Sequence, residues 1–288
     1  VKMVISKVAS SGGGRRPRKR IMILDVKRAF LYAAMKSELY IKFPPEATEG
    51  DTEEMFGLLL KAMYGTREAP QSWQAHVTQI MHSLGFEAGR CNPCVFKHKG
   101  RDLVISVHVD DFLAAGEPKD LAWLQKELDK HFESKSVVLG DGPGEVRSAK
   151  YLGRTLTWES KGITYEHDPR HVETMLGDLG MMECNGVDNP GVKDTPADDD
   201  VKLGQTDATK TRKIIATMNY ISQDRPDLGY AVKERTRGMA TPTERTVRLV
   251  KRVGRYRKNH PRMVCLYGWQ ERPAGFTTYT DSDWAGCV

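Results

Sequence analysis

Apolar and polar positions alternate along the chain in patterns that predict both strands and helices. Runs with strand character occupy residues 21–26, 38–46, 94–116 and 149–167, and the last of these resembles a hairpin that turns at 160–162. Helical spacing of apolar residues covers 71–84, 121–132, 211–240 with a break at 225–226, and 243–259. Residues 1–20 end in a glycine- and arginine-rich run that predicts a flexible basic segment, and residues 276–286 return to strand character. The pattern therefore indicates a mixed α and β protein.

One apolar run, LVISVHVDDFLAAG at residues 103–116, carries Asp110 and Asp111 side by side at its centre. Burying an unpaired carboxylate is costly, and two adjacent carboxylates also repel each other. A divalent cation such as Mg²⁺, which takes carboxylate and phosphate oxygens as ligands, would compensate both effects. The alternative is that the two aspartates mark a tight turn.

Asp25 supplies a third carboxylate, near the end of the apolar run 21–26. If strands 21–26 and 103–109 pair, Asp25 would converge with Asp110 and Asp111. Three such carboxylates suit two metal ions about 4 Å apart, which stabilise the attacking and leaving oxygens of a phosphoryl displacement. The alternative role for Asp25 is to cap the following helix.

Charge is distributed unevenly along the 288 residues, whose net charge is +6. Residues 210–262 hold fifteen Lys or Arg against four Asp or Glu, whereas residues 188–207 hold six Asp and two Lys. On the predicted helix 243–259, one face carries Arg245, Arg248, Arg252 and Arg255. A basic region of this kind favours a polyanionic partner, and a solvated charged surface is the alternative.

The five cysteines do not indicate a secreted disulfide scaffold, and no apolar run approaches the roughly 18 residues of a membrane span. Cys91 and Cys94 form a single CxxC with His98 nearby, whereas a structural zinc site needs about four ligands. Packing is therefore the competing explanation for this pair. The chain begins at Val1 without a signal peptide and ends inside a patterned segment, so we expect a fragment of a longer protein.

Several motifs in series resemble the reverse transcriptases of copia-type retrotransposons. They are, in order, DVKRAFLYAAMKSELYIKFPPE, LLKAMYGTREAPQSW, LGFEAGRCNPCVF, HVDDFL, YLGRTLTW, NYISQDRPDLGYAV and TDSDWAG. The resemblance runs from about residue 21 to the end of the chain. It implies an α+β polymerase right-hand fold with an antiparallel-sheet palm, partial fingers and a helical thumb or connection.

The resemblance also implies roles for the carboxylates. Asp25 and Asp110 would be the main ligands of two Mg²⁺ ions, with Asp111 beside them and Mn²⁺ as a substitute metal. One ion would lower the pKa of the primer 3′-hydroxyl, and the other would hold the nucleotide phosphates. Phe30, five residues after Asp25, matches an aromatic steric gate that excludes a ribose 2′-hydroxyl, with a core position as the alternative.

Further residues match family motifs near nucleic acid. Tyr64, Gly65, Arg67, Pro70 and Trp73 belong to a motif near the template and the incoming nucleotide. Gly65 would permit close backbone approach and Arg67 would meet a phosphate, whereas Trp73 fits a core position equally well. Tyr151, Leu152 and Gly153 resemble the hairpin that grips the primer terminus. The arginines of helix 243–259 would follow the duplex backbone without reading bases.

Three features depart from the family pattern. His108 stands where the family has Tyr, two residues before the paired aspartates. Only about twenty residues precede the first motif, so Arg18, Lys19 and Arg20 are the substitutes for basic finger residues that contact the triphosphate. Asp281 resembles the first metal ligand of a ribonuclease H domain, but the chain ends seven residues later, and we expect no ribonuclease H activity.

The expected organisation is a basic flexible segment with partial fingers at 1–20, palm and fingers with the primer-grip hairpin at 21–187, an acidic linker at 188–209, a helical thumb or connection at 210–265, and a truncated start of ribonuclease H at 266–288.

The expected activity is RNA-directed DNA polymerisation on an RNA or DNA template, with a primer and deoxynucleoside triphosphates as partners. It would take place inside the cell, in a cytoplasmic particle or the nucleus, and without a membrane. The rivals are an inactive transposon-derived remnant that still binds nucleic acid, and a metal-dependent nuclease. Host and oligomeric state stay open.

Overall fold

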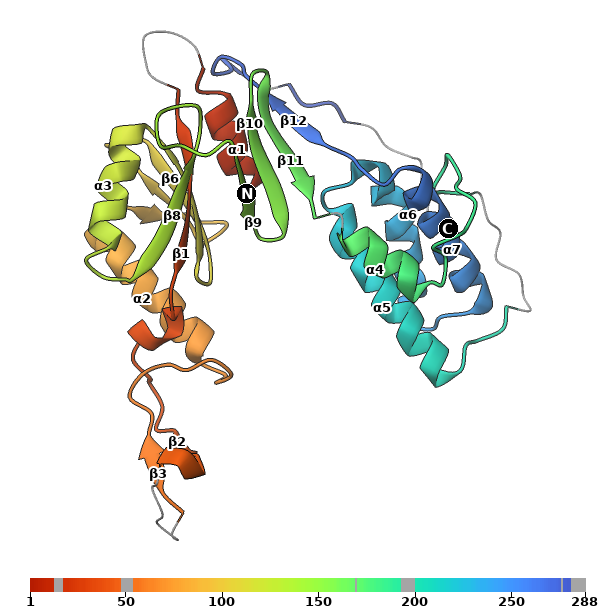
Figure 1. Cartoon of the computed structure of the whole chain (residues 1–288), viewed down its shortest axis with the longest axis horizontal. Helices are drawn as coiled ribbons and strands as arrows, with labels where there is room; N and C mark the ends of the chain where they lie inside the picture. Colours follow the sequence, from red (N-terminus) through yellow and green to blue (C-terminus); the bar gives the residue numbers. More distant parts are fainter. Residues whose placement is uncertain (13–17, 48–53, 169, 193–199, 276, 281–288) are drawn as a thin grey trace. The chain divides into compact units, whose positions relative to one another are not determined.

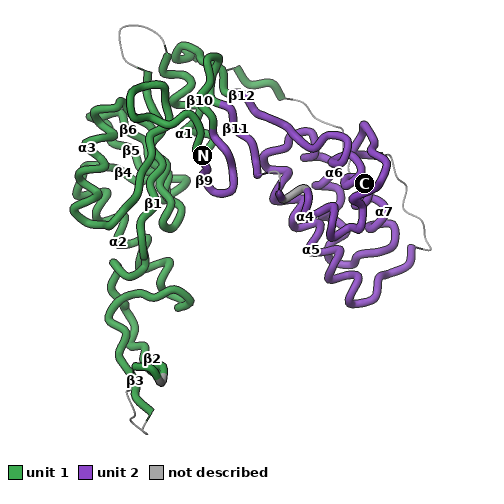
Figure 2. The backbone as a smooth tube through the Cα atoms, viewed as in Figure 1, with its two compact units in different colours: residues 1–149, 157–163, 267–288 green, residues 150–156, 164–266 purple. Residues whose placement is uncertain are grey.

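The computed structural model describes residues 1–12, 18–47, 54–168, 170–192, 200–275 and 277–280. The chain divides into two compact units, which Figure 2 distinguishes by colour. Unit 1 comprises residues 1–149, 157–163 and 267–288, and unit 2 comprises residues 150–156 and 164–266.

The first half of the chain contains α1 (Lys2–Ala9), β1 (Arg20–Val26), the 3₁₀ turn η1 (Ala29–Tyr32), β2 (Tyr40–Lys42), η2 (Pro45–Ala47), β3 (Phe56–Leu58), α2 (Ala69–Ser83), β4 (Glu87–Ala88), β5 (Val95–His98), β6 (Leu103–His108), β7 (Asp111–Gly116), α3 (Pro118–Leu128) and β8 (Ser134–Leu139). The second half contains β9 (Ser148–Tyr151), β10 (Arg154–Glu159), β11 (Gly162–His167), α4 (Arg170–Asp178), α5 (Gln205–Ser222), α6 (Pro226–Thr236), η3 (Arg237–Met239), α7 (Glu244–Asn259) and β12 (Cys265–Gly268). Figure 1 shows these elements in sequence colours.

Unit 1 is built on a six-stranded sheet in the order β4-β5-β6-β7-β1-β8, in which the pairs along β1, β5, β6 and β7 are antiparallel. Successive side chains of a strand point to opposite faces. Met22, Leu24 and Val26 of β1 therefore share one face, where they join a core with Trp73 of α2 and Leu124 of α3. Helices α2 and α3 cover this face (Figure 1).

The other face of the same sheet is covered by α1, which packs against β1, β6 and β7 (Figure 1). Val4, Ile5 and Val8 of α1 are fully buried. The expectation that residues 1–20 form a flexible segment is therefore wrong for Lys2–Ala9. The signal that was available is the spacing of these three apolar residues at i, i+1 and i+4, which places them on one helix face.

Two smaller sheets accompany the main one. Strands β2 and β3 form a two-stranded antiparallel ladder, and a four-stranded sheet has the order β12-β11-β10-β9. The predicted turn at 160–162 connects β10 to β11, as expected. The predicted strand at 276–286 is absent from the described residues 277–280, and Asp281 lies outside the described residues. The antiparallel sheets and the helices together confirm a mixed α and β architecture.

In unit 2, helices α4 to α7 pack around an apolar core that includes Ile215, Val232 and Val253. The predicted helix break occurs between α5 and α6, where Arg225 precedes Pro226 at the start of the second helix. Proline fixes its own φ and is tolerated in the first turn of a helix, which explains why α6 begins there. Helix α7 confirms the prediction for 243–259, and the side chain of Thr243 caps its first turn.

Candidate active site

The three predicted carboxylates meet at one end of the six-stranded sheet. The direct pairing of strands 21–26 and 103–109, considered above as the way to bring them together, does not occur, because β7 lies between β6 and β1. The correct pairing is β1 with β7, in which Asp25 is the register partner of Asp111. The backbone N–H of Val26 donates a 2.9 Å hydrogen bond to the carbonyl oxygen of Asp110. Hairpin β6–β7 therefore brings both of its aspartates beside Asp25.

These carboxylates are not enclosed in the core. The apolar residues of β6 and β7 are buried, but Asp25 is exposed, and Asp110 and Asp111 are half-buried at the turn between the strands. The charged groups thus lie where an apolar hairpin reaches solvent. Since Asp25 alternates along β1 with Met22 and Leu24 of the helix-covered face, Asp25 lies on the α1 face of the sheet.

The carboxylates of Asp25, Asp110 and Asp111 repel one another at the turn. Burial raises the pKa of the Asp111 carboxyl, and the neighbouring charges of Asp110 and Asp25 raise it further, while His108 opposes them. His108 is the register partner of Asp111 on β6. Adjacent anionic oxygens at a solvent-facing edge are the donor chemistry that Mg²⁺ accepts, so the residues present fit this ion. Among the described residues no three His, Cys, Asp or Glu side chains are already arranged as a metal cluster.

The CxxC motif directly precedes β5, and the Cys94 thiol donates to the side-chain oxygen of Gln74 at 3.7 Å rather than to a carboxylate. Cys91 is exposed and Cys94 half-buried, and both thiols are free. The ring of His98 packs edge-on against Phe86 and Trp123 at centroid distances of 5.1 and 5.7 Å. His98 is thus engaged in aromatic packing, the alternative to a zinc site.

The turn that carries Asp110 and Asp111 is held by α2. Val109 has a φ of 56°, which is uncommon for a β-branched residue. The indole N–H of Trp73 donates a 2.6 Å hydrogen bond to the Val109 carbonyl oxygen. Trp73 is only 1% exposed, so its side chain cannot contact nucleic acid in this conformation, and the core alternative holds for it. Pro70 stands in the first turn of the same helix.

Phe30 and the YGTREAP segment lie near this helix. Phe30 is in η1 and is 8% exposed, and its ring centroid lies 4.6 Å from that of Tyr64. Tyr64 is 49% exposed, so the ring of Phe30 is shielded while that of Tyr64 stays open to solvent. Gly65 has a φ of 90°, a Cβ added there would meet no atom within 4 Å, and Arg67 is exposed. A backbone in this left-handed region favours glycine.

The residues matched to a primer grip lie in unit 2. Leu152 and Gly153 form the β9–β10 turn with φ values of 48° and 71°. The turn is held by two hydrogen bonds, from the Arg154 guanidinium to the Leu152 carbonyl (2.6 Å) and from the Asp168 N–H to the Gly153 carbonyl (3.0 Å). Tyr151 is 2% exposed, so its side chain belongs to the core rather than to a contact surface.

The arginine face of α7 is partly occupied by the chain itself. The Arg252 and Arg255 side chains donate to the backbone carbonyls of Gly191 (3.1 Å) and Asn185 (2.8 Å). The Arg245 backbone N–H donates to the carboxylate of Asp200, whose pKa is lowered by a hydrogen bond from Thr243 and by the charges of Arg245 and Arg248.

This docking of segments 185–191 and 200–203 along α7 was not predicted. The available signal was the acidic composition of 188–207 directly before a basic helix. Arg248 is the most exposed of the four arginines. In the part of the chain that the structure describes, no helix combines the length and apolar character that a membrane crossing requires.

Comparison with known proteins identifies the same family as the series of sequence motifs. Residues 15–193 match the family model described as reverse transcriptase (RNA-dependent DNA polymerase). The chain is 26% identical over 268 residues to the retrovirus-related Pol polyprotein from transposon RE1 of Arabidopsis thaliana, covering 91% of this chain and 18% of that protein. It is 26% identical to the corresponding polyprotein from transposon TNT 1-94 of Nicotiana tabacum, covering 92% of this chain and 20% of that protein.

A third relative is the transposon Ty1-DR1 Gag-Pol polyprotein of Saccharomyces cerevisiae, 32% identical over 128 residues that cover 43% of this chain and 7% of that protein. The chain therefore spans about a fifth of the length of the Arabidopsis and Nicotiana polyproteins. The family match covers more than half of the chain and includes Asp25, Asp110 and Asp111. The chain thus belongs to the reverse transcriptase (RNA-dependent DNA polymerase) family, in the form carried by copia-type retrotransposon Pol polyproteins.

Proposed function

We propose that this chain is an RNA-directed DNA polymerase that adds deoxynucleotides to the 3′ end of a primer on an RNA or DNA template. The observation that carries the proposal is the register pairing of Asp25 with Asp111, with Asp110 next to it at the β6–β7 turn. In this proposal the six-stranded sheet is the palm, and helices α5, α6 and α7 form the thumb or connection.

The reaction is a phosphoryl displacement. The primer 3′-oxygen forms a bond to the α-phosphorus of the incoming deoxynucleoside triphosphate, the bond from that phosphorus to the bridging oxygen breaks, and pyrophosphate leaves. The proton of the 3′-hydroxyl passes to solvent. Two Mg²⁺ ions, when bound, supply acidification of that hydroxyl and neutralisation of the leaving charge.

Asp25, Asp110 and Asp111 would hold the metal ions through their carboxylate oxygens. The residues come from two paired strands and one turn, so the sheet ladder brings their backbones together before any ligand binds. The repulsion that raises the pKa of Asp111 would be relieved by divalent charge. Relief of this repulsion would make cation binding at this edge more favourable.

Selection of deoxynucleotides would fall to Phe30, which matches the aromatic steric gate of the family. Its ring packs in the helix-covered core and its centroid lies 4.6 Å from that of Tyr64, so packing restricts the movement of this ring. Arg67 is exposed and would meet a phosphate of the triphosphate. Gly65 lacks a side chain at a left-handed position, so the backbone there can approach a base or sugar closely.

Primer extension tests the proposal directly. The assay contains an RNA template, a labelled DNA primer, Mg²⁺ and all four deoxynucleoside triphosphates. Asp110→Asn is expected to lower extension at least a hundredfold, because one carboxylate ligand is lost while the size of the side chain is kept. Asp207→Asn, the same chemical change at an exposed position in the first turn of α5, is the matched control and should extend normally.

Two outcomes would contradict the polymerase. Extension that is equal in the wild type and in Asp110→Asn would show that the carboxylates are not the metal site. Absence of extension by the wild type, together with template–primer binding that weakens as salt rises, would favour the transposon-derived remnant that binds nucleic acid without catalysis.

A further inference from the structure

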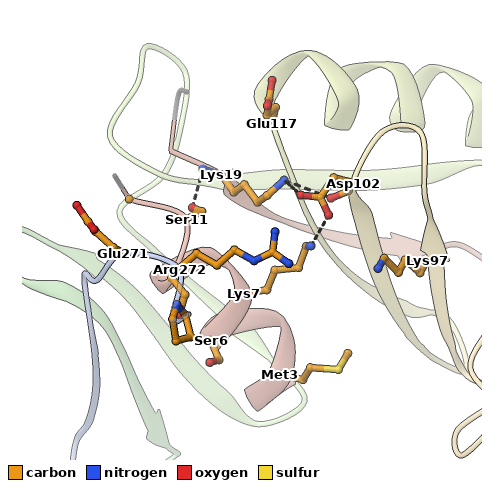
Figure 3. Close-up of a pocket in the computed structure, with 13 residues that line it drawn as sticks. Met3, Ser6, Lys7, Ser11, Lys19, Lys97, Asp102, Glu117, Glu271 and Arg272 are labelled. Carbon is orange, nitrogen blue, oxygen red and sulfur yellow. Dashed lines mark hydrogen bonds and ion pairs between the residues drawn. The ribbon is translucent and has the colours of Figure 1, made fainter. Parts of the chain in front are cut away.

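Unit 1 contains a second polar site at the end of its sheet away from the carboxylates. It is a cavity of about 840 Å³ between α1, the turn that joins β5 to β6, and residues 271–273 (Figure 3). Four cationic side chains line it, contributed by four separate parts of the chain: Lys7, Lys19, Lys97 and Arg272. Four like charges around one cavity repel one another unless an anion offsets them.

One carboxylate offsets part of this charge. Asp102 accepts hydrogen bonds from the ammonium groups of Lys7 (2.6 Å) and Lys19 (3.0 Å). Burial raises the pKa of Asp102, but these two lysines outweigh it and hold the pKa at about 2. A single carboxylate shared by two ammonium groups leaves one positive charge in excess.

The other two acidic residues of the lining contribute little to balancing the cations. The Glu117 carboxylate is paired with Lys119, which lies outside the lining, at 3.3 Å. Figure 3 shows the Glu271 carboxylate directed away from the lysines, whereas the Arg272 guanidinium is directed toward Lys7 and Lys19. Among the described residues, neither Lys97 nor Arg272 has an ion-pair partner.

The chain two residues before Arg272 is hydrogen-bonded to the end of α1. The N–H of Gln270 donates to the carbonyl oxygen of Ala9 at 3.1 Å, and the Gln270 side chain donates to the Ser10 hydroxyl at 2.9 Å. The segment that carries Arg272 is therefore attached to the C-terminal end of α1. The hydroxyl of Ser6, one residue before Lys7 on the same helix, adds a hydrogen-bond donor to the lining.

This cavity is distinct from the carboxylate edge. Lys19 lies directly before β1, and Asp25 lies near the other end of that strand, so at about 3.3 Å per residue the two are roughly 20 Å apart. Both are on the α1 side of the sheet, because Asp25 shares the face that α1 covers and Lys19 lines the cavity beside α1.

We propose that the cavity lined by Lys7, Lys19, Lys97 and Arg272 is a phosphate-binding site, separate from the polymerase carboxylates. Guanidinium and ammonium groups that converge on one space are the donors that phosphate oxygens take. The phosphate can come from the backbone of a nucleic-acid strand or from a free phosphate compound, and both sources present the same tetrahedral dianionic or monoanionic oxygens. The proposal does not depend on polymerase activity.

Direct binding measurements without Mg²⁺ and without nucleotides test it. The test variant is the double substitution Lys97→Ala and Arg272→Ala, since both side chains are exposed and carry no ion pair that the fold needs. The matched control is Arg90→Ala with Lys126→Ala, which removes one arginine and one lysine from exposed positions of unit 1 outside the cavity. Thermal unfolding checks that both double variants fold like the wild type.

The first arm measures fluorescence anisotropy of a labelled single-stranded oligonucleotide over a range of salt. For a nucleic-acid phosphate source, the test variant should bind at least fivefold more weakly at low salt, with the slope of log K against log salt reduced by about 1.4, because two phosphate contacts are lost. The second arm titrates sodium pyrophosphate in a calorimeter. For a free phosphate source, the test variant should lose at least fivefold in pyrophosphate affinity while oligonucleotide binding matches that of the control.

Either pattern supports the site and identifies the source of the phosphate. Equal behaviour of the test and control variants in both arms overturns the proposal. Because neither arm involves nucleotide addition, a chain that fails in primer extension can still show the site, and a chain that extends primers can still lack it.

Discussion

The indole N–H of Trp73 donates a 2.6 Å hydrogen bond to the carbonyl oxygen of Val109, the residue that immediately precedes Asp110 and Asp111. Trp73 is on α2 and is 1% exposed, whereas Val109 is 37% exposed and has a φ of 56°. A buried side chain is thus hydrogen-bonded to an exposed turn that has an uncommon backbone conformation. The hydrogen bond therefore links the tryptophan of the second motif to the backbone of the turn that carries Asp110 and Asp111.

Replacing Trp73 with Phe keeps an aromatic ring in the core but removes this hydrogen bond. We expect the free energy of unfolding to fall by about 1 kcal/mol, the usual net value of one hydrogen bond. The turn is expected to shift, and kcat for primer extension should fall about tenfold or more because small displacements of catalytic groups are costly. Single-turnover extension measures this. Trp123→Phe, a half-buried tryptophan of α3 without a bond to the turn, is the control, and equal losses in the two variants would contradict a positioning role for Trp73.

Asp111→Asn should stabilise the metal-free chain and reduce its stabilisation by Mg²⁺. At pH 7 in metal-free buffer, the substitution removes a charge that Asp110 and Asp25 repel, so the urea midpoint should rise. Solvent screening keeps the gain to about 0.5 kcal/mol. Added Mg²⁺ should stabilise the wild type more than the variant, because the variant has lost one carboxylate ligand. A lower urea midpoint for the variant in metal-free buffer would show that repulsion does not dominate at this turn.

Asp102 gives unit 1 a pH-dependent stability. Its pKa of about 2 in the folded chain lies below the ordinary value of 3.8. A carboxyl whose folded pKa is depressed stabilises the fold above pH 3.8, and that stabilisation is lost as pH falls from 3.8 towards 2. Since the side chain is 48% exposed, we expect the ionised carboxylate to add only about 1 kcal/mol to the free energy of unfolding.

Asp102→Asn tests this pH dependence, and asparagine tolerates the left-handed φ of 50° at this position. Urea unfolding should show the variant less stable than the wild type at pH 7, with the difference shrinking at pH 3. Glu127→Gln, which removes the charge from an ion pair between α3 and Lys130 just after the helix, is the control. A difference between Asp102→Asn and wild type that stays constant from pH 7 to pH 3 would rule out the lysine pairing as its source.

The arginines of α7 should contribute unequally to nucleic-acid binding. Arg248 is exposed, whereas the Arg255 side chain already donates to the Asn185 carbonyl. Arg248→Gln should weaken binding of a labelled primer–template duplex about threefold or more and lower the salt slope by about 0.9, and Arg255→Gln should do less. Asp200→Asn should strengthen binding, because it removes a negative charge beside Arg245 and Arg248 while keeping a hydrogen-bond acceptor. Equal effects of Arg248→Gln and Arg255→Gln would show that the docked segment does not compete with the duplex.

Local sequence patterns were enough for most elements. β1, α2 and α7 each follow from a run of residues whose apolar spacing has the period of one secondary structure, and the break before α6 follows from Pro226. The motifs likewise located Asp25, Asp110 and Asp111 in the chain. Helix α1 was missed because its short apolar spacing is followed by a basic run that suggests a loop.

Tertiary structure alone decided what those residues contact. β7 rather than β6 pairs with β1, because strand order depends on which edges meet across the whole sheet, and no single strand records this in its own pattern. The same holds for the Trp73–Val109 bond, which joins residues 36 positions apart, and for the carbonyls of residues 185 and 191 on the arginines of α7. Periodicity within a segment determines the element that forms, whereas partners distant in sequence are selected only when the elements pack together.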